Sequence, residues 1–265
     1  MTTVLVLAAQ RAGVVNPLAE RAGVSHKCIV PNCGKPLIVH VMNALAQLSP
    51  LPEVRISVEP EIHEALAALL APYRERGMVL EFVASSDNIA QSVLVAAEGQ
   101  PGPVVITTAD NVLLKPEWVT GLLGKLTDAD CVACMARKES VQAVHAEAQR
   151  NFYEFRDGGY ANCNLYGVAG PHAFAAIEVF REGGQFQKNP KRLITAFGLV
   201  NILLVRLGWV SLPRAMKLAS RRFRLTFSAL VIADGSAAVD VDNERTYRIA
   251  EMVLNQRMAG AHDNT

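Results

Sequence analysis

The sequence has no strong excess of charge of either sign. Its 265 residues include 26 Lys and Arg against 25 Asp and Glu, which is a formal net charge of +1. A domain that binds nucleic acid usually carries a marked basic excess. The composition therefore gives no reason to expect nucleic acid as a partner, and any basic surface must be local.

Cysteine is scarce, and its number is odd. An odd count, together with an N-terminus that lacks a basic stretch followed by a cleavable apolar run, indicates a reducing cytoplasm and not a disulfide framework. Cys131 and Cys134 form a C-x-x-C pair, but no second pair or histidine cluster completes a tetrahedral zinc site. We interpret them as buried strand residues, with redox or zinc chemistry as the alternative. The five cysteines are Cys28, Cys33, Cys131, Cys134 and Cys163.

Long hydrophobic runs, internal repeats and low-complexity tracts are also lacking. The strongest apolar stretch, Leu193 to Val205, has 13 residues and is followed by Arg206. A membrane-spanning helix needs about 20 such residues, so this stretch does not cross a membrane. The chain is long enough to bury a full core. We expect one domain over residues 1–265, with an insertion at about 188–224.

Strands alternate with helices along most of the chain. This order predicts an α/β fold with a doubly wound, mostly parallel sheet. Predicted helices are the one opening at Gly34-Lys35-Pro36, then Glu61–Arg76, Asn88–Glu98, the helix at Pro116, Pro171–Arg181 and Glu244–Met258. Predicted strands are Val4–Ala8, Glu53–Val58, Met78–Val83, Gly102–Thr107, Ala129–Ala136, Asn151–Phe155, Cys163–Val168, Leu225–Ile232 and Ala237–Val241.

The segment from Thr3 to Leu45 is typical of a nucleotide site. A buried strand leads into a long polar loop that holds Lys27, and a helix then opens. The free amides and dipole of a helix N-terminus favour anions, so backbone N–H groups and a cation meet where a phosphate chain can lie. The alternative is that Lys27 is one surface lysine among many.

Ligands in open α/β sheets bind beyond the carboxyl ends of the strands. Gln10-Arg11 follows the first predicted strand, and Thr108-Ala109-Asp110 follows the strand that ends at Thr107. A carboxylate at the end of a buried strand, with no basic residue beside it in sequence, is costly unless it binds something, and Mg²⁺ bridging nucleotide phosphates would compensate it. Asp110 could instead cap the Pro116 helix, but that helix begins too late.

Three ordered motifs together resemble the NTP-transferase (nucleotidyltransferase) family, which has a GT-A-type Rossmann-like fold and includes molybdenum-cofactor guanylyltransferase. They are LAAQRAG…HK…GKPLIVHVMNAL, VVITTADNVLLKPEWV and VDVDNERTYRIAEMVL. The resemblance implies a Mg²⁺-dependent enzyme. It would transfer a nucleoside monophosphate from an NTP, with CTP or GTP favoured, to a phosphorylated small molecule and release pyrophosphate.

The resemblance also implies roles for the phosphate and metal residues. Lys27 and Arg11 would be catalytic: Lys27 would approach the α-phosphate and the acceptor phosphate, and Arg11 would hold the β- and γ-phosphates. Asp242, with Asp240 as its neighbour, would be the second metal ligand beside Asp110; alternatively, Asp242 only caps the helix at Glu244. The nucleotide-binding loop would be Ala8, Ala9, Gln10 and Arg11, although Gln10 stands where the family often has glycine and His26 where it usually has proline.

The base and the acceptor are assigned by the same resemblance. Ser85, Asn88 and Ser92, together with Thr108, would contact the nucleotide, although the serines before the helix could equally be N-capping residues. Asn162 and Asn164 would bind the acceptor, or else form local hydrogen bonds in a turn. An alternative function on the same fold is a glycosyltransferase that uses a nucleotide sugar, but Thr108-Ala109-Asp110 lacks the second carboxylate expected there.

The predicted insertion combines an apolar stretch with many Lys and Arg residues between Lys188 and Arg224. Such a segment packs on the sheet, forms a homodimer interface, or lies at a membrane surface through about residues 190–224. In the last case the protein is membrane-peripheral, and its product is a nucleotide-activated polar head group for lipid assembly.

Overall fold

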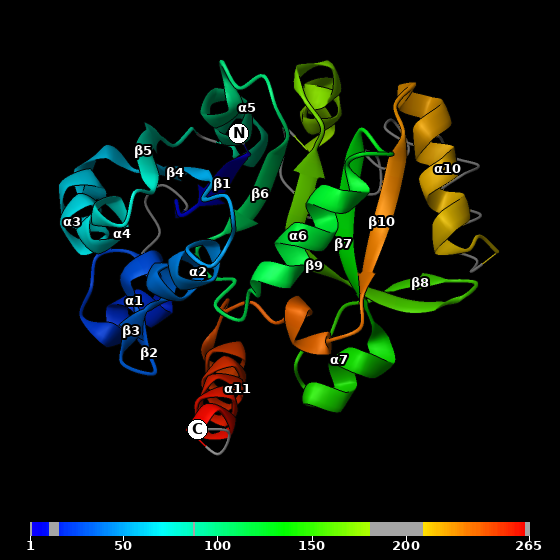
Figure 1. Cartoon of the computed structure of the whole chain (residues 1–265). Helices are drawn as coiled ribbons and strands as arrows, with labels where there is room; N and C mark the ends of the chain where they lie inside the picture. The colour runs from blue at the N-terminus through cyan, green and yellow to red at the C-terminus, as the bar shows by residue number, and fades with distance from the viewer. Residues whose placement is uncertain (1, 11–15, 87, 181–208, 263–265) are drawn as a thin grey trace.

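The structure is a computed structural model that describes residues 2–10, 16–86, 88–180 and 209–262. A mixed sheet lies at its centre, with the strand order β10-β7-β9-β6-β1-β4-β5 and with β8 paired to β9 (Figure 1). The strands are β1 (Thr3–Leu7), β4 (Glu53–Val58), β5 (Val79–Ala84), β6 (Val104–Thr108), β7 (Cys131–Arg137), β8 (Tyr153–Phe155), β9 (Gly158–Val168) and β10 (Phe227–Ile232).

The sheet is mostly parallel, as the sequence predicts. β1 pairs in parallel with both β4 and β6, β4 with β5, and β10 with β7. β9 is antiparallel to both of its neighbours in the sheet, β6 and β7. The carboxyl ends of β1, β4, β6 and β7 therefore meet at one edge, where a ligand site is expected.

Helices cover both faces because the side chains of each strand alternate between two cores. In β1, Val4 and Val6 pack on the face that carries α2 and α6, while Leu5 packs on the face that carries α5 and η3. Near the edge strand β10, Leu212 of α10 packs with Met135 of β7. The principal helices are α2 (Leu37–Leu45), α3 (His63–Leu69), α4 (Ala71–Glu75), α5 (Ile89–Ala97), α6 (Pro116–Lys125), α7 (Lys138–Val144), η3 (Pro171–Phe180), α10 (Leu212–Phe223) and α11 (Glu244–His262).

The long loop predicted after the first strand contains structure of its own. A short helix, α1 (Pro17–Ala22), is followed by the 3-10 turn η1 (Lys27–Ile29) and a small hairpin, β2 (Pro31–Asn32) with β3 (Lys35–Pro36). The side chain of Asn16 accepts a hydrogen bond from the N–H of Leu18 at 2.9 Å. An Asn cap followed by proline at the first helical position is a local start signal, so the interpretation of this segment as a plain loop was wrong.

Two predicted helices differ from the structure. The single helix expected over Glu61–Arg76 is a 3-10 turn, η2 (Pro60–Ile62), followed by α3 and α4. Pro72 lies at the start of α4 and cannot donate a hydrogen bond to the preceding turn, which explains the break. The helix expected at Pro171–Arg181 is a 3-10 helix as far as Phe180, and Arg181 lies outside the described residues.

The strand predicted at Ala237–Val241 is also wrong, because the chain coils there into a 3-10 turn, η5 (Gly235–Ala238). The carboxylate of Asp234 accepts from the N–H of Ser236 at 2.9 Å and starts the turn. A Cβ at Gly235 would lie 2.1 Å from the carbonyl oxygen of Ser140, so only glycine allows this approach to α7.

Most of the predicted insertion at 188–224, including Leu193–Val205, lies outside the described residues; the described part contains α10. Its other boundaries and the single-domain organisation over residues 1–265 stay predictions. None of the helices in the described ranges has the length and apolar character that a membrane span requires.

Candidate functional site

Lys27 joins segments that are far apart in the sequence. Its Nζ donates to a carboxylate oxygen of Asp110 and, at 3.0 Å, to Oδ1 of Asp242. The side chain of Lys27 is 17% exposed and that of Asp110 15%, whereas that of Asp242 is 64% exposed. The structure therefore brings the predicted phosphate cation and both predicted metal ligands to one point at the carboxyl edge of the sheet.

The electrostatics of this cluster favour a charged lysine. Burial alone lowers the pKa of Lys27, but the carboxylates of Asp110 and Asp242 outweigh burial and raise the pKa above its ordinary value of 10.5. No basic residue stands beside Asp110 in the sequence, but the fold brings one to it. The compensating cation comes from a position 83 residues earlier in the chain.

The cluster also holds buried oxygens with no partner. Within the described ranges, Oγ1 of Thr108, Oδ1 of Asp110 and Oδ1 of Asp240 are buried and have no hydrogen-bond partner. Leaving a buried acceptor unpaired costs about 1–3 kcal/mol. Such a cost is relieved when a ligand or cation binds at these oxygens, so this end of β6 has the chemistry of a binding site.

Asp240 lies beneath this cluster. Burial raises its pKa well above the ordinary 3.8, and the charges of Asp110 and Asp242 raise it further. Its Oδ2 accepts a hydrogen bond from Nδ2 of Asn164 at 2.7 Å. Alternate residues of the predicted strand at Ala237–Val241 would place Asp240 and Asp242 on one face. Because this segment is not a strand, they do not share a face: Asp240 is buried and Asp242 is exposed to solvent.

The two candidate acceptor residues lie within β9 and not in a turn. The pairing of β9 with β7 shifts register between Ala133 and Met135. Strand β9 therefore bulges in the stretch that contains Asn164. Within the bulge, Asn164 has a φ of +45°, and its Oδ1 accepts from Nδ2 of Asn162 at 2.8 Å. Asn164 donates to Asp240 and Asn162 donates to Asn164, so hydrogen bonds connect the predicted acceptor residues to the carboxylate cluster.

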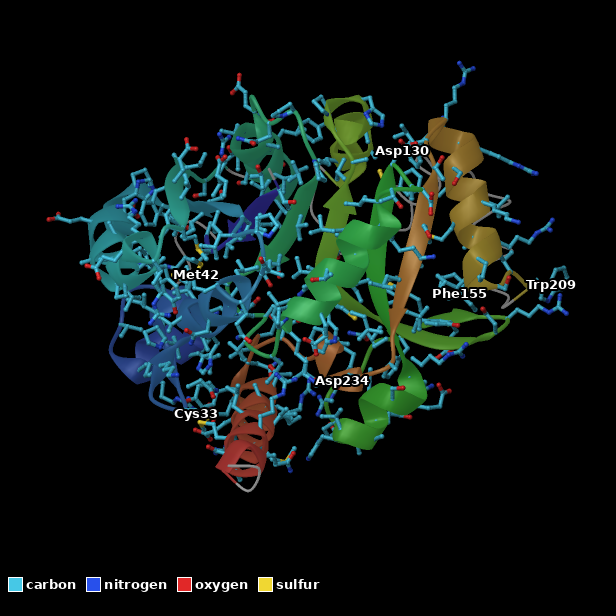
Figure 2. All side chains as sticks on the ribbon, viewed as in Figure 1. Cys33, Met42, Asp130, Phe155, Trp209 and Asp234 are labelled. Atoms are coloured by element: carbon cyan, nitrogen blue, oxygen red, sulfur yellow. The ribbon has the colours of Figure 1, made fainter. Side chains whose placement is uncertain are left out.

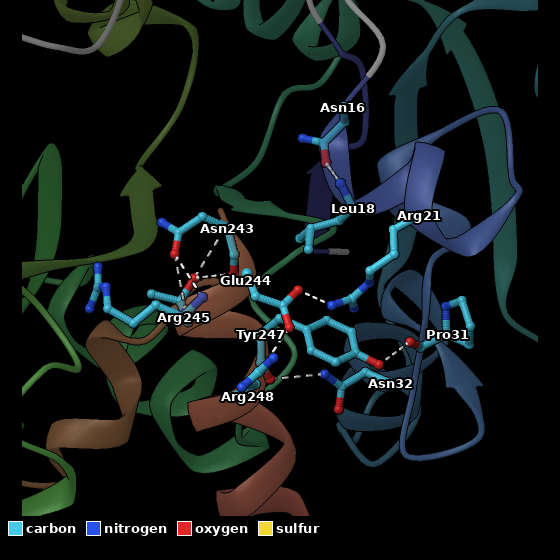
Figure 3. A network of polar contacts seen from close by, with 11 residues as sticks. Asn16, Leu18, Arg21, Pro31, Asn32, Asn243, Glu244, Arg245, Tyr247 and Arg248 are labelled. Atoms are coloured by element: carbon cyan, nitrogen blue, oxygen red, sulfur yellow. Dashed lines mark hydrogen bonds and ion pairs between the residues drawn. The ribbon is translucent and has the colours of Figure 1, made fainter.

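Asp242 is held in place by the start of α11. Asn243, not Asp242, caps this helix: its Oδ1 accepts from the N–H groups of Arg245 and Thr246 at 3.1 and 3.2 Å (Figure 3). Oγ1 of Thr246 accepts in return from the N–H of Asp242 at 3.0 Å. The alternative that Asp242 serves as the helix cap is therefore wrong, and its carboxylate is free to face Lys27.

The first turn of α11 is also tied to the N-terminal segments (Figure 3). The hydroxyl of Tyr247 donates to the carbonyl of Pro31 at 2.8 Å, and Glu244 pairs with Arg21 of α1. Tyr247 also lies under the guanidinium of Arg21, 4.7 Å from the ring centroid. These contacts hold Asp242 across from Lys27.

The predicted phosphate loop is fastened to the end of β4. Gln10 donates its backbone N–H to Oε1 of Glu59 at 2.8 Å and its side-chain amide to the carbonyl of Ser25 at 3.1 Å. His26 is buried, with Nε2 3.7 Å from Oε2 of Glu59. Ala8 and Ala9 precede this bridge at the end of β1, and Arg11 lies outside the described residues.

The predicted base contacts have local structural roles in the described structure. Oδ1 of Asn88 accepts from the N–H of Gln91 at 2.9 Å, so Asn88 is the N-cap of α5. Oγ of Ser92 accepts from the N–H of Ser86 at 2.9 Å and closes the same turn. The backbone N–H of Ser85 donates to Val58 at 3.0 Å, which places it beside the end of β4. Ser85 lies at the predicted edge of the sheet, while Asn88 and Ser92 are engaged in the turn itself.

One basic side chain beside the cluster was not predicted. In the described structure, Nη1 of Arg245 is buried and has no hydrogen-bond partner, although Arg245 is only three positions from Asp242. Residues three positions apart are neighbours in a helix, so the spacing of Asp242 and Arg245 could have indicated that the two side chains lie near each other. A cavity of about 510 Å³ lies there, lined by His145, Glu147, Glu244, Arg245, Arg248 and Ile249.

The fold and the cluster define an α/β protein that gathers a lysine and carboxylates at the carboxyl edge of the sheet, where such folds bind ligands. The model of the MobA-like NTP transferase domain matches residues 4–176, so the chain belongs to this family. Asp240 and Asp242 lie beyond the matched range. No match was found among curated proteins.

Solved structures support the same fold. A hypothetical transferase from Thermus thermophilus is 25% identical with a TM-score of 0.70, over 93% of this chain and 98% of the other. A 4-diphosphocytidyl-2C-methyl-D-erythritol synthase from Anaerococcus prevotii is 10% identical with a TM-score of 0.60, over 96% and 98% of the two chains. A CMP:2-keto-3-deoxy-manno-octonic acid synthetase complexed with CTP is 13% identical with a TM-score of 0.57, over 97% and 100%. The predicted family and fold class are confirmed.

Proposed function

We propose that this nucleotidyltransferase moves a nucleoside monophosphate from CTP or GTP to a phosphorylated small alcohol or acid. An oxygen of the acceptor phosphate attacks the α-phosphorus, the bond to the β-phosphate oxygen breaks, and pyrophosphate leaves. The single observation that carries the proposal is the bridge from Lys27 to Asp110 and Asp242. It combines the cation and the carboxylates that such a transfer needs at one point.

Lys27 stabilises the negative charge that develops on the α-phosphoryl group. A cation that is already positioned costs no reorganisation during the reaction, and this electrostatic contribution is usually the largest one. The raised pKa of Lys27 keeps it protonated. No side chain needs to act as a general base, because the acceptor phosphate is already ionised near neutral pH.

Asp110 and Asp242 would hold Mg²⁺, which takes few protein oxygens and completes its shell with phosphates and water. The donor set fits, because Oδ1 of Asp110 is buried without a partner in the described structure and Asp242 is exposed toward solvent. The described residues contain no group of three His, Cys, Asp or Glu side chains that could hold a metal by itself. Bound there, the ion would neutralise phosphate charge.

The remaining roles follow the arrangement around this centre. Ala8, Ala9, Gln10 and Arg11 would line the triphosphate, with Thr108 and Ser85 toward the nucleoside. The acceptor would lie over the bulge of β9, where Asn162 and Asn164 would bind it; a lipid head-group phosphate belongs to this class. Asn88 and Ser92 would shape the base pocket through the turn before α5, since their side chains are engaged in that turn.

The test is pyrophosphate release from ATP, CTP, GTP and UTP with Mg²⁺, against a panel of phosphorylated alcohols, sugars and acids. We expect release that needs one NTP and one acceptor and that is abolished in Asp110→Asn. Asp128→Asn is the matched control, because Asp128 is an exposed carboxylate after α6. Transfer from a nucleotide sugar, with no release from any NTP, would contradict the proposal in favour of a glycosyltransferase.

A further inference from the structure

The helix α10 carries an unusually basic surface for a chain of nearly balanced charge. Residues 209–224 contain no Asp or Glu, whereas the chain as a whole has a net charge of only +1. A local cationic surface of this kind attracts a polyanionic partner. The exposed basic residues are Arg214, Lys217, Arg221, Arg222 and Arg224.

These charges have no counter-ions within the described part of the protein. Other basic residues do: Arg55 pairs with Glu53 and Glu81, and Lys115 pairs with Asp234. No ion pair of the described residues involves the five basic residues on α10. Within the described residues, no carboxylate therefore neutralises their charge; Arg222 lies over the ring of Phe223, which leaves its charge in place.

The apolar side of α10 is already used inside the protein. Leu212 is buried and Met216 packs beside it in a small core with Tyr160 of β9. The ring of Phe223 lies 5.5 Å from that of Phe227. Since this side packs on the sheet, α10 cannot turn its apolar face to a partner, and what it presents outward is its basic face.

The start of α10 is rigidly attached and displays a tryptophan. The N–H of Leu212 donates to Oδ1 of Asp157 at 2.8 Å, and Arg156 donates its N–H to Val210 at 2.9 Å. Trp209, immediately before the anchored Val210, is 66% exposed and points away from the body of the protein (Figure 2). Tryptophan is enriched at membrane interfaces, where its ring lies at head-group level.

We propose that α10 and Trp209 bind the surface of an anionic lipid bilayer. The basic face would contact anionic head groups, and Trp209 would enter the interface without any segment crossing the membrane. A nucleic acid is the less suitable partner, because a domain that binds nucleic acid usually carries a marked basic excess and this chain has a net charge of only +1. The proposal does not depend on nucleotidyl transfer; if both hold, a nucleotide-activated polar head group would form at the lipid surface.

The test is flotation of the full-length protein with phosphatidylcholine vesicles that either contain or lack phosphatidylglycerol. We expect binding to the anionic vesicles only, and release at high salt, because salt screens exposed charges. The double variant Arg214→Gln/Lys217→Gln should lower the partition coefficient about 25-fold, at about fivefold for each charge. The control Arg76→Gln/Lys125→Gln removes two exposed charges elsewhere and should bind like the wild type.

A second measurement uses the two tryptophans of the chain. Trp118 is buried in α6, so a blue shift of the emission on adding anionic vesicles should come from Trp209. The shift should disappear in Trp209→Phe. The proposal would be overturned if both double variants bound equally well, or if the protein bound neutral and anionic vesicles equally. Binding to an oligonucleotide but not to vesicles would also overturn it. So would a dimer in sedimentation that dissociates when Arg214 and Lys217 are neutralised.

Discussion

The two halves of the sheet contribute to the site in different ways. In the half formed by β5, β4, β1 and β6 every pairing is parallel, and candidate residues follow directly after strands. In the half formed by β9, β7 and β10, an antiparallel strand with a bulge and the turn η5 place the candidate residues. The first half supplies Lys27 and the second supplies Asp242, with Asp110 at the boundary.

This difference predicts which substrates are affected by substitutions in each half of the sheet. A phosphate chain is common to all NTPs, so a regular strand, loop and helix serve it in any member. The acceptor differs from one enzyme to another, and irregular backbone can aim individual side chains without changing the sheet. We therefore expect variants of the first half to affect all substrates, and variants of the second half to affect acceptors selectively.

The largest effect is expected where the two halves meet. Lys27→Met should lower kcat/KM by about 100- to 1000-fold, the loss typical of removing one preorganised donor. It should also lower the free energy of unfolding by about 3 kcal/mol, because it leaves the buried Asp110 beside Asp240 without a cation. Activity assays and urea unfolding measure the two effects, and Lys27→Arg is the matched control that keeps the charge. Unchanged activity and stability in Lys27→Met would remove the basis of the proposed site.

The pH dependence of the same bridge has a definite sign. The pKa of Lys27 is raised by folding, so its contribution is fully present below the ordinary lysine value of 10.5 and is lost only as the pH rises through the higher folded value. We expect the stability difference between wild type and Lys27→Met to stay constant from about pH 6 to 9 and to shrink only in strong alkali. A difference that falls across neutral pH would contradict this.

The next effect compares the two carboxylates. Asp110 is largely buried, whereas the side chain of Asp242 is 64% exposed. Asp110→Asn should therefore lower activity at least about 100-fold and Asp242→Asn by about 10-fold, since desolvated charges act more strongly. Titration of Mg²⁺ in the assay should show a raised requirement in Asp242→Asn. Equal losses in the two variants would contradict the difference in burial.

The parallel strands of the first half were predictable from sequence, although the loop after β1 and the helix over Glu61–Arg76 were not. The strand at Glu53–Val58 has the predicted bounds, and Asn88 precedes α5 as expected. Apolar runs and caps are local signals, and parallel βα units need little more. The cation Lys27 was also predictable, because its place before the turn that leads to α2 depends on nearby residues.

The second half was not predictable in the same way. The bulge that carries Asn164 depends on its pairing with β7, and η5 forms because Gly235 packs against the backbone of Ser140. These are contacts between distant segments, and a strand pattern in the sequence does not reveal them. The compensation of Asp110 by Lys27 was missed for the same reason.

The backbone of Asn164 gives a smaller test within the second half. Its φ of +45° favours glycine or asparagine, and its amide donates to Asp240. Asn164→Ala should lower the free energy of unfolding by about 2–3 kcal/mol, from the unfavourable φ and the unpaired carboxyl group. Asn164→Gly should lower it by about 1 kcal/mol less, because glycine accepts this φ. Urea unfolding of both variants measures the difference, and equal stability would mean that the bulge relaxes.

The contacts of Asp130, just before β7, should have a moderate effect on stability. Asp130 accepts from the N–H of Thr226 at 2.6 Å and from His172 at 2.8 Å, and these bonds lower its pKa below 3.8. Asp130→Asn should lower stability by about 1–2 kcal/mol at neutral pH. This contribution is present above the unfolded value and is lost as the pH falls through the lowered folded value, so the gap should shrink below about pH 4. Asp128→Asn should behave like the wild type at both pH values.

The smallest effect concerns the thiols. Burial raises the pKa of Cys28, Cys131 and Cys134 to about 12, so their thiolates are rare and inaccessible. Only Cys33, which is partly exposed beside α11 (Figure 2), should react with a thiol reagent in the native protein, and slowly, because burial raises its pKa as well.

The C-x-x-C pair should then be silent in both redox and zinc assays. Cys131 packs in the core on the α5 face and Cys134 in the core on the α2 and α6 face. Side chains three positions apart in a strand point to opposite faces, so the two sulfurs cannot share a bond or a metal. Counting thiols before and after denaturation should give one and then five, with the first lost in Cys33→Ser. A second thiol that reacts in the native protein would contradict this prediction.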